Sequence, residues 1–448
     1  MPRSRPFNGV LSADAVVSTL KSRFEYDDPN PFAFGALSYS LNESTDTEIF
    51  NAAARRISRE LCLNNPFAIN ALENRVNYVV GFGHKYQATP RDVQDAELAQ
   101  KTQDIVVDFI VANDWFKRQQ EILRRYDRDG EVFLRFFRDD AGKTVVRFVE
   151  PEQVKTPQGH TSRSTRCGVV SDKRDAEKIL GYWIDDVFVD AAKIQHRKAN
   201  VDVTASRGVP LLYPVRDNLR RAEKLLRNMS VVAEIQSSIA LIRKHANGSQ
   251  ETIRRFVRDK SASNNDLAPR ERFQPGTIVD ATAGVDYEFP IAGIDAPRYV
   301  QILQAELRAI AARLTIPEFM LSSDASNANY SSTNIAEGPA VRNFERMQHE
   351  LFKEDMKIVW RVVEDAVLRG DLPEDVGRRV SIQAIPPSLA VRDRLSEAQA
   401  DEILMNAGVI SPQTAAMRYG LDPNRERALQ RQLRQELASS EKSEKSKQ

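Results

Sequence analysis

The spacing of apolar residues predicts that the N-terminal part of the chain is mainly helical. A helical period begins at Asp46. A second helix opens with Asn65, whose side chain can cap free N–H groups, and with Pro66, which suits the first helical position. Apolar positions three and four residues apart predict two further helices, at 91–112 and 115–126. The first two helices should pack as a pair.

The period then changes from 3.6 to 2, which is typical of strands. Residues 131–137 and 144–150 are rich in Val, Phe and Leu and are joined by a short turn, so they predict a β-hairpin. Strand-like segments follow at 179–184 and around 192–196. A small sheet packed on helices is therefore expected, and the fold class is α+β and mainly helical.

Two long helices are predicted on either side of a small insertion. The first, 213–245, would be about 45 Å long at 1.5 Å per residue, and the second, 297–314, stops before Pro317. Between them, 246–290 contains Ser, Asn and Pro together with strand-like segments. Helices of this length are unusual in a compact enzyme and suit one spoke of a ring.

The remaining segments are interpreted from their composition. Residues 322–334 are small and polar, which predicts a loop, and Gly338-Pro339 opens a helix that runs to Arg369. Short amphipathic helices follow it. Residues 1–45 predict an extended arm of the kind that often lies on a neighbouring subunit, and 436–448 predict a disordered tail rich in Ser, Lys and Glu.

Composition and charge exclude several classes of protein. The 448 residues suffice for roughly two to four domains, and 41% hydrophobic with 28% charged residues excludes global disorder. A formal net charge of +1 limits any contact with nucleic acid to local patches. Two cysteines favour a reducing compartment. No signal-peptide pattern and no run of about 18 apolar residues occurs, so a soluble protein is expected.

No motif predicts catalysis or cofactor binding. Residues 141–144 resemble the end of a phosphate-binding loop, but Phe137 stands where its first glycine would be, which favours a hairpin turn. Gly81 and Gly83 are better explained by a helix C-cap than by a dinucleotide fingerprint. The five histidines are scattered without the spacing of metal ligands, and the acidic pairs lack a companion motif. We therefore expect no enzyme activity, no metal and no cofactor.

A local excess of basic residues lies in the insertion between the two long helices. From Arg243 to Arg272 there are eight Lys or Arg and four acidic residues. Six of these basic residues are candidates for contact with a charged partner: Arg254, Arg255, Arg258, Lys260, Arg270 and Arg272. Two interpretations stay open, a solvated basic face and a surface that contacts phosphates or an acidic partner.

Three stretches of the sequence share their order and spacing with a known family. The first combines KIQH at 193–196 with SRGVPLL at 206–212, the second is PGTI at 275–278, and the third is DAS at 324–326 followed by NYSS at 329–332. In this order they resemble the portal proteins of tailed bacteriophages, most closely the lambda-type portal family. The similarity spans roughly 66–373. The family often has a basic residue soon after the third stretch, where this chain has Thr333-Asn334-Ile335.

The resemblance implies a structural protein. Portals of this family form a ring, usually of twelve subunits, at one vertex of an icosahedral capsid, and double-stranded DNA passes through it during packaging and ejection. The implied partners are further copies of the chain, the DNA, the terminase large subunit, a head-tail connector (adaptor) protein and the major capsid protein, without a membrane. The implied location is the virion, and the host cytoplasm during assembly.

By position, the resemblance assigns each segment a place in such a subunit. The segments are an extended N-terminal arm (1–45), an α+β wing (46–212), two stem helices (213–245 and 291–315), a clip (246–290), a tunnel loop (316–335), a long wing helix and its return (336–385), a helical crown (386–435) and a disordered tail (436–448). The clip, which carries the basic residues, would meet the terminase motor and afterwards the neck proteins.

The tunnel loop is expected to line the constriction of the channel. Its candidate DNA-facing residues are small and polar apart from one acid and one aromatic: Ser322, Ser323, Asp324, Asn327, Asn329, Tyr330 and Ser331. Such side chains offer hydrogen bonds without a strong electrostatic field, so DNA would pass without binding tightly.

Two other functional classes of protein stay open. A nucleic-acid-processing enzyme such as a metal-dependent nuclease would need a cluster of acidic ligands, and a helical adaptor scaffold would fit the composition.

Overall fold

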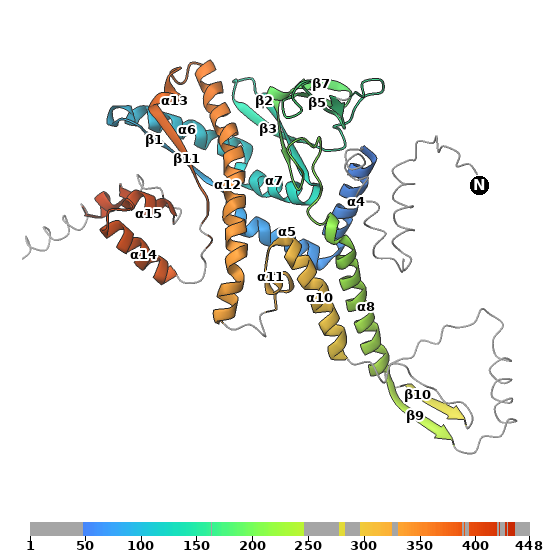
Figure 1. Cartoon of the computed structure of the whole chain (residues 1–448). Coiled ribbons are helices and arrows are strands. Elements are labelled where there is room, and N and C mark those ends of the chain that lie inside the picture. The colour runs from blue at the N-terminus through green and yellow to red at the C-terminus, as the bar shows by residue number, and fades with distance from the viewer. Residues whose placement is uncertain are drawn as a thin grey trace, which may run out of the picture. The chain divides into compact units, whose positions relative to one another are not determined.

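The computed structural model describes residues 48–162, 164–245, 277–282, 296–324, 330–387, 389, 394–418, 421, 426–427 and 429–434. The chain divides into two compact units, Met1–Arg216 with Leu314–Gln448, and Asp217–Arg313 (Figure 1). The predicted arm at 1–45, the predicted tail at 436–448 and most of the predicted clip at 246–290 lie outside the described residues.

The helices predicted from the apolar spacing are confirmed in the first unit. They are α4 (Glu48–Asn64), α5 (Pro66–Val79), α6 (Ala96–Asn113), which follows a 3-10 turn η1 (Val93–Asp95), and α7 (Trp115–Asp129). The Asn65 side chain accepts hydrogen bonds from the N–H groups of Phe67 and Ala68, as expected of an N-cap. After α5, Gly81 has φ +52° and its N–H donates to Val76 O, so this glycine ends the helix.

Two antiparallel sheets form much of the β part of the first unit. The first has the order β3-β2-β8, made of β2 (Glu131–Arg138), β3 (Thr144–Val149) and β8 (Ile194–Lys198), with a 3-10 turn η2 (Ala191–Lys193) before β8. The second has the order β4-β5-β6-β7, made of β4 (Thr165–Arg166), β5 (Val169–Ser171), β6 (Ile179–Ile184) and β7 (Val187–Asp190). The predicted hairpin is confirmed by the pairing of β2 with β3. Both sheets contribute to one apolar core, in which Phe133, Tyr182 and Ile194 are buried.

The sequence pattern does not predict one pair of strands. β1 (Lys85–Pro90) pairs antiparallel with β11 (Val380–Ile385), which follows the short helix α13 (Val376–Arg379). Only Tyr86 and Ala88 are fully buried in β1. A six-residue segment with two buried positions gives a weak period, and its partner lies almost 300 residues further along the chain.

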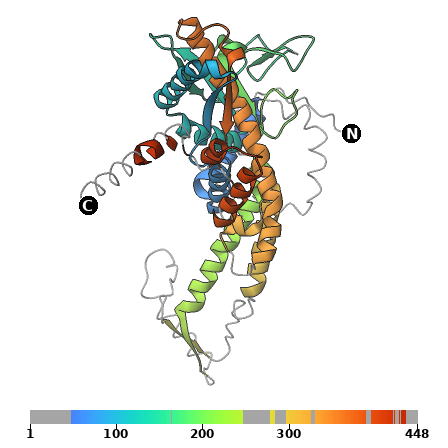
Figure 2. The ribbon, with the colours of Figure 1, turned by 90° about the vertical axis from the view of Figure 1, so that its left-hand side faces the viewer.

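The long C-terminal helix begins earlier than predicted. α12 (Tyr330–Leu368) is the long orange helix in Figures 1 and 2, and it already includes the eight residues before Gly338. It continues through Pro339, whose missing N–H deprives the carbonyl of Ile335 of its helical partner. The Ile335 side chain is 80% exposed, so water can reach this turn and bond to that carbonyl. Beyond the proline, Ala340 and Phe344 are buried and hold the helix in place.

The loop predicted at 322–334 is shorter in the structure. Helix α11 (Glu318–Ser322) ends where the loop was expected to begin, and α12 already contains 330–334. Residues 325–329 lie outside the described part of the chain. Composition was misleading here because Ser, Thr and Asn are frequent in loops and also at the first turn of helices.

Two short helices, α14 (Arg394–Asn406) and α15 (Pro412–Arg418), follow β11 in the region predicted as the crown. They confirm the short helices expected there from the sequence. Among the described helices, none combines the length and the apolar character needed to cross a membrane.

The second unit contains two helices that lie side by side, α8 (Arg216–Ser238) and α10 (Ala296–Leu314) (Figure 1). Asn218 Nδ2 and Arg221 Nε of α8 donate to the Glu306 carboxylate of α10 at 2.7 and 2.8 Å. These contacts join the two helices that the sequence predicts as a pair.

The prediction of a helix over 213–245 is wrong at the C-terminal end of that range. A 3-10 turn η3 (Tyr213–Val215) precedes α8, and β9 (Ile239–His245) follows it and pairs in parallel with β10 (Thr277–Thr282). Ile239 and Ile242 are β-branched and favour a strand once β10 offers a partner. β10 begins at Thr277, within the PGTI stretch.

Candidate functional site

The structure describes five of the seven residues predicted for the DNA-facing part of the tunnel loop. Ser322 ends α11, Ser323 and Asp324 follow it, and Tyr330 and Ser331 open α12. Outside the described residues lie Asn327 and Asn329 of the loop and all six basic residues of the clip, Arg254, Arg255, Arg258, Lys260, Arg270 and Arg272. The geometry of the loop is therefore known at its two flanks.

The first flank is the C-terminal end of α11. Ser322 Oγ donates to Glu318 O at 3.1 Å, and the Asp324 N–H donates to Ser322 Oγ at 3.3 Å. Ser323 has φ +58°, the left-handed conformation that commonly follows a last helical turn. The chain therefore turns away from α11 at one defined residue.

Two asparagines of α5 bind the same end of α11. Asn70 Nδ2 donates to the carbonyl oxygens of Met320 (3.0 Å) and Leu321 (2.7 Å). Asn74 Nδ2 donates to Met320 O at 2.6 Å and lies 3.4 Å from Asn70 Oδ1. The spacing of four residues places both amides on one face of α5. We call Asn70 and Asn74 the asparagine clamp.

The second flank, α12, also packs on α5. The rings of Tyr78 in α5 and Phe344 in α12 stack with their centroids 4.9 Å apart and their planes 7° from parallel. Gln348 Nε2 donates to Tyr78 O at 3.1 Å and to Pro387 O at 3.0 Å. Both helices that flank the loop are thus fixed to the same helix.

A different polar cluster in the first unit is centred on Glu131, whose side chain is fully buried. Arg207 donates to both carboxylate oxygens, with Nη2 2.6 Å from Oε1 and Nε 2.9 Å from Oε2. Arg55 Nη1 lies 3.1 Å from Oε1, and His196 Nε2 lies 3.1 Å from Oε2. We call Glu131, Arg207, Arg55 and His196 the Glu131 cluster.

The two segments of the first family-like stretch meet in this cluster. His196 belongs to the KIQH segment and Arg207 to the SRGVPLL segment. Arg207 also donates to the carbonyl oxygens of Val154 (2.7 Å), Cys167 (2.9 Å) and Pro151 (2.9 Å). The sequence pattern does not single out Glu131. Its signal is an acidic residue that directly follows Gly130 and precedes three apolar residues at the start of β2.

The glycine after Arg207 is needed for close backbone packing. A Cβ on Gly208 would lie 1.9 Å from Gly130 O, and a Cβ on Gly130 would lie 2.3 Å from the carbonyl carbon of Val209. Ala199 N donates to Gly130 O at 2.8 Å, and Val209 N donates to Ala199 O at 3.0 Å. The Arg-Gly-Val order thus places an arginine on Glu131 and a glycine against the start of β2.

The electrostatics of the cluster follow from burial and close pairing. Burial alone would raise the pKa of Glu131, but the charge of Arg207 and the hydrogen bond from His196 outweigh it and hold the pKa well below its ordinary value. Burial lowers the pKa of His196, which its hydrogen bond to Glu131 opposes only in part. Because an ionised carboxylate only accepts, the neutral His196 ring carries its proton on Nε2. The cluster joins α4, β2 and β8 to the segment that carries Arg207, and its ionisable side chains are buried.

A second buried network joins α12 to β1, α7 and β8, and the sequence pattern does not predict it either. Asp355 of α12 accepts from Arg197 Nη2 (2.6 Å), Tyr86 Oη (3.0 Å) and Gln119 Nε2 (2.8 Å). Burial, followed by the charge of Asp355, raises the pKa of Tyr86 well above its ordinary value. The signal for this site is an aspartate on the buried face of an amphipathic helix.

The stretch that resembles a phosphate-binding loop is a hairpin turn, as predicted. Gly142 has φ +73° and its N–H donates to Asp139 O at 2.9 Å, which closes the turn between β2 and β3. Lys143 Nζ lies 3.2 Å from an Asp108 carboxylate oxygen. The lysine thus has an acidic neighbour on α6, and the glycine has a conformational role.

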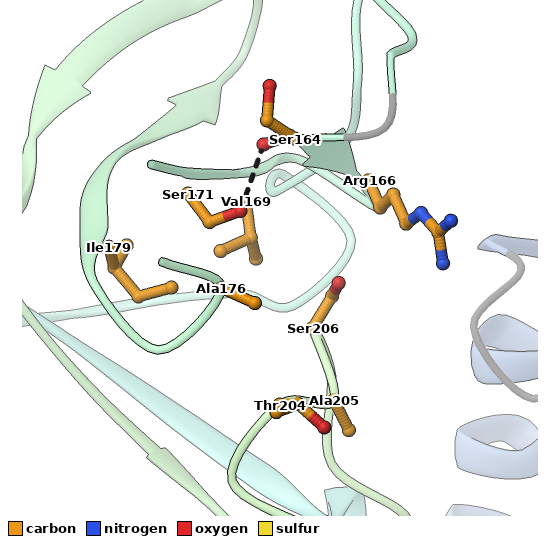
Figure 3. A pocket seen from close by; sticks show the side chains of 9 residues that line it. All are labelled: Ser164, Arg166, Val169, Ser171, Ala176, Ile179, Thr204, Ala205 and Ser206. Atoms are coloured by element: carbon orange, nitrogen blue, oxygen red, sulfur yellow. Dashed lines mark hydrogen bonds between the residues drawn. The ribbon is translucent and has the colours of Figure 1, made fainter. Parts of the chain in front are cut away.

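One pocket of about 210 Å³ opens beside the four-stranded sheet (Figure 3). Its polar side chains are mostly hydroxyls, and Ser171 Oγ donates to Ser164 O at 3.3 Å. Arg166 points away from Ser171 and Val169 in Figure 3. Hydroxyls without a neighbouring base do not form a nucleophilic site. Across the described ranges, no group of three or more His, Cys, Asp or Glu side chains is placed to hold a metal ion.

Comparison with known proteins gives one family. The family model for "Phage portal protein, lambda family" matches residues 38–348, which is more than two thirds of the chain. No curated protein sequence matches the chain.

Several solved structures match the chain at low sequence identity. The neck of a native gene transfer agent particle, computed with C12 symmetry, shares 15% identity over 82% of this chain and 94% of that chain, with a TM-score of 0.37. The virion of a native gene transfer agent particle shares 14% identity over 83% and 94%, with a TM-score of 0.41. An HK97-family phage portal protein from Corynebacterium diphtheriae shares 13% identity over 62% and 83%, with a TM-score of 0.31. The family assignment rests on the family model.

Proposed function

The chain belongs to the lambda family of phage portal proteins, and we propose that its copies form a ring through which double-stranded DNA enters and leaves a capsid. The protein is a structural connector of the virion. The observation that carries the proposal is the family match over 38–348, which includes the Glu131 cluster, both long helices of the second unit and the flanks of the tunnel loop. A ring, usually of twelve subunits, is the assembly typical of this family.

The stem and clip assignments in the proposal are supported by the second unit. The stem would be formed by α8 and α10, which are joined through Glu306. β9 directly precedes the predicted clip at 246–290 and pairs with β10, which lies within it. The six basic residues of that insertion would give it a positive surface for the terminase large subunit and afterwards for the head-tail connector protein.

The channel assignment concerns residues 316–335. The mostly small and polar residues at 322–334 would let DNA pass with weak and uniform contact, since each added Lys or Arg would create a phosphate contact. The proposed partners further include the major capsid protein around the ring, with assembly in the host cytoplasm. The alternative of a metal-dependent nuclease gains no support from the described residues, which hold no candidate metal group.

The mass of the assembled protein tests the ring. Native mass spectrometry of the full chain should give a species near twelve times the subunit mass of 50.6 kDa. A ring of another subunit number would support the portal assembly and correct the number. A sharp monomer at micromolar concentration across salt conditions would contradict the proposal.

A further inference from the structure

The asparagine clamp holds the end of α11 from which the tunnel loop departs. We infer that Asn70 and Asn74 are positioning residues that set the direction in which 323–329 leaves α11, and hence where the loop meets DNA. The inference rests on the proposed function, because it matters for DNA only where the loop lines the channel. It goes beyond that function by assigning the position of the loop to α5, a helix almost 250 residues away in the sequence.

The helix α11 is too short to satisfy its own last carbonyl groups. It ends at Ser322, so the carbonyls of Met320 and Leu321 have no further helical turn to donate to them. Asn70 Nδ2 donates to both carbonyls, and Asn74 Nδ2 donates to the first of them. The clamp therefore fixes the orientation of two successive peptide groups directly before the loop.

Apolar packing already holds the body of α11. Ile316 and Leu321 are 6% and 1% exposed, so burial fixes this segment in the first unit without help from the asparagines. Apolar contact has no preferred direction, whereas a hydrogen bond weakens steeply when its angle departs from linear. The contribution of the clamp is thus directional, and it acts at the peptide groups next to Ser323.

The sequence of α5 agrees with a role outside the helix. Asparagine is a weak helix former because its side chain competes for backbone hydrogen bonds, yet two asparagines occur four residues apart in the interior of this helix. Their side chains bond to α11 and to each other. The contact with α11 explains both positions, which helix propensity alone does not.

The far side of the loop is fixed to the same helix. Tyr78 of α5 stacks on Phe344 of α12, and its carbonyl accepts from Gln348. With the clamp on α11 and this stack on α12, α5 contacts both helices that flank the loop. A shift of one flank relative to the other would change the reach of the loop.

Hydrogen exchange of the assembled full-length ring tests the clamp itself. The Asn70→Ala/Asn74→Ala variant should exchange the amides of peptide 318–324 at least tenfold faster than wild type, while the β2–β3 hairpin is unchanged. Asn70→Asp/Asn74→Asp keeps the size but removes the donors, and it should lose the same protection. Asn77→Ala, an exposed position on the same helix, is the matched control and should change nothing. Unchanged protection in either double variant would overturn the inference.

DNA retention in assembled particles tests the positioning role. Rings of the double alanine variant should keep their mass, and particles built on them should hold full-length genome several-fold less often than particles with Asn77→Ala. Faster exchange with normal retention would overturn the inference. The Asn327→Arg/Asn329→Arg variant in the same assay separates the two ideas. If the arginine variant alters DNA retention and the double alanine variant does not, the role of the clamp is contradicted while the channel assignment stands. If neither variant alters DNA retention, both the channel assignment and the role of the clamp are contradicted.

Discussion

The guanidinium of Arg207 donates to both carboxylate oxygens of Glu131, and both side chains are buried, at 2% and 0% exposure. The planar guanidinium matches a carboxylate in this geometry, so the pair is directional as well as charged. Removing Arg207 leaves the buried Glu131 carboxylate with only Arg55 and His196 to compensate its charge. The contact between β2 and the Arg-Gly-Val-Pro segment should therefore be sensitive to single substitutions.

Arg207→Met is expected to lower the free energy of unfolding by about 3–5 kcal/mol, because it leaves Glu131 without its main partner. Chemical denaturation followed by circular dichroism measures the change. Arg342→Ala is the control, since its ion pair with Glu345 is exposed and should contribute at most about 1 kcal/mol. Equal losses in the two variants would show that the Glu131 cluster is not a main determinant of stability.

Stability should fall as the pH drops below 6.5. Burial lowers the pKa of His196 and of His84 from their ordinary value of 6.5, so the folded state holds both rings neutral while the unfolded chain takes up protons. The unfolded state is then favoured by up to about 1.4 kcal/mol per pH unit and histidine until the folded pKa is reached. Glu131, with a lowered pKa, adds a loss only below about pH 4.5, where the unfolded carboxyl protonates.

The variant His196→Gln isolates one of these contributions. Glutamine can still donate to Glu131 but does not titrate. The fall in unfolding free energy between pH 7.5 and 5.5 should be smaller in this variant than in wild type. An identical pH profile would mean that His196 does not contribute to the pH dependence.

Two glycines should respond to alanine in opposite directions. A methyl group on Gly208 would lie 1.9 Å from Gly130 O, so Gly208→Ala should destabilise by about 3 kcal/mol or more. Gly338 lies within α12 with nothing within 4 Å of an added Cβ, so alanine there should stabilise by about 0.5–1 kcal/mol. Thermal melting of both variants checks the pair. A Gly208→Ala protein with the wild-type midpoint would contradict the packing at the start of β2.

Most helices and the hairpin follow from local spacing, which is why α5 and β2–β3 are predicted nearly residue by residue. The pairing of β1 with β11 does not, since each strand is only six residues long and the two are far apart in sequence. The asparagine clamp and the Glu131 cluster could not be predicted for the same reason, because their residues are far apart in the sequence. Nothing near Asn70 indicates a partner 250 residues away at Met320, and nothing near Glu131 indicates Arg207. The resemblance draws attention to His196 and Arg207, and the structure shows the carboxylate that they share.

Lys143→Ala should leave stability within about 0.5 kcal/mol of wild type, since the lysine lies in an exposed turn beside Asp108. We also expect no ATP hydrolysis by the purified ring, because the turn lacks the first glycine of a phosphate-binding loop. A coupled assay for phosphate release measures this. Turnover that disappears in the Lys143→Ala variant would overturn the expectation.

Asn327→Arg/Asn329→Arg should retain DNA or stall its passage while leaving the ring intact. In the proposed channel each subunit would then add two positive charges to the segment 322–334, in which Asp324 is the one charged residue. Every arginine could contact a DNA phosphate, and the release of counterions would strengthen that contact. Repeated around the ring, such contacts would bind the DNA strongly where weak contact is needed. The measurements are packaged genome length and ejection from particles that carry the variant, with ring mass as the check on assembly.

The matched control places arginine elsewhere. Asn77→Arg adds one positive charge per subunit at an exposed position of α5, so it should leave packaging and ejection normal. Asn327→Asp/Asn329→Asp reverses the sign and should weaken DNA contact, because carboxylates repel phosphates. Raising the salt concentration should relieve retention in the arginine variant, since each phosphate contact becomes weaker as salt rises. Full-length packaging and normal ejection by the arginine variant would remove 325–329 from the DNA path, and a surface loop at a contact between subunits would then be the better assignment.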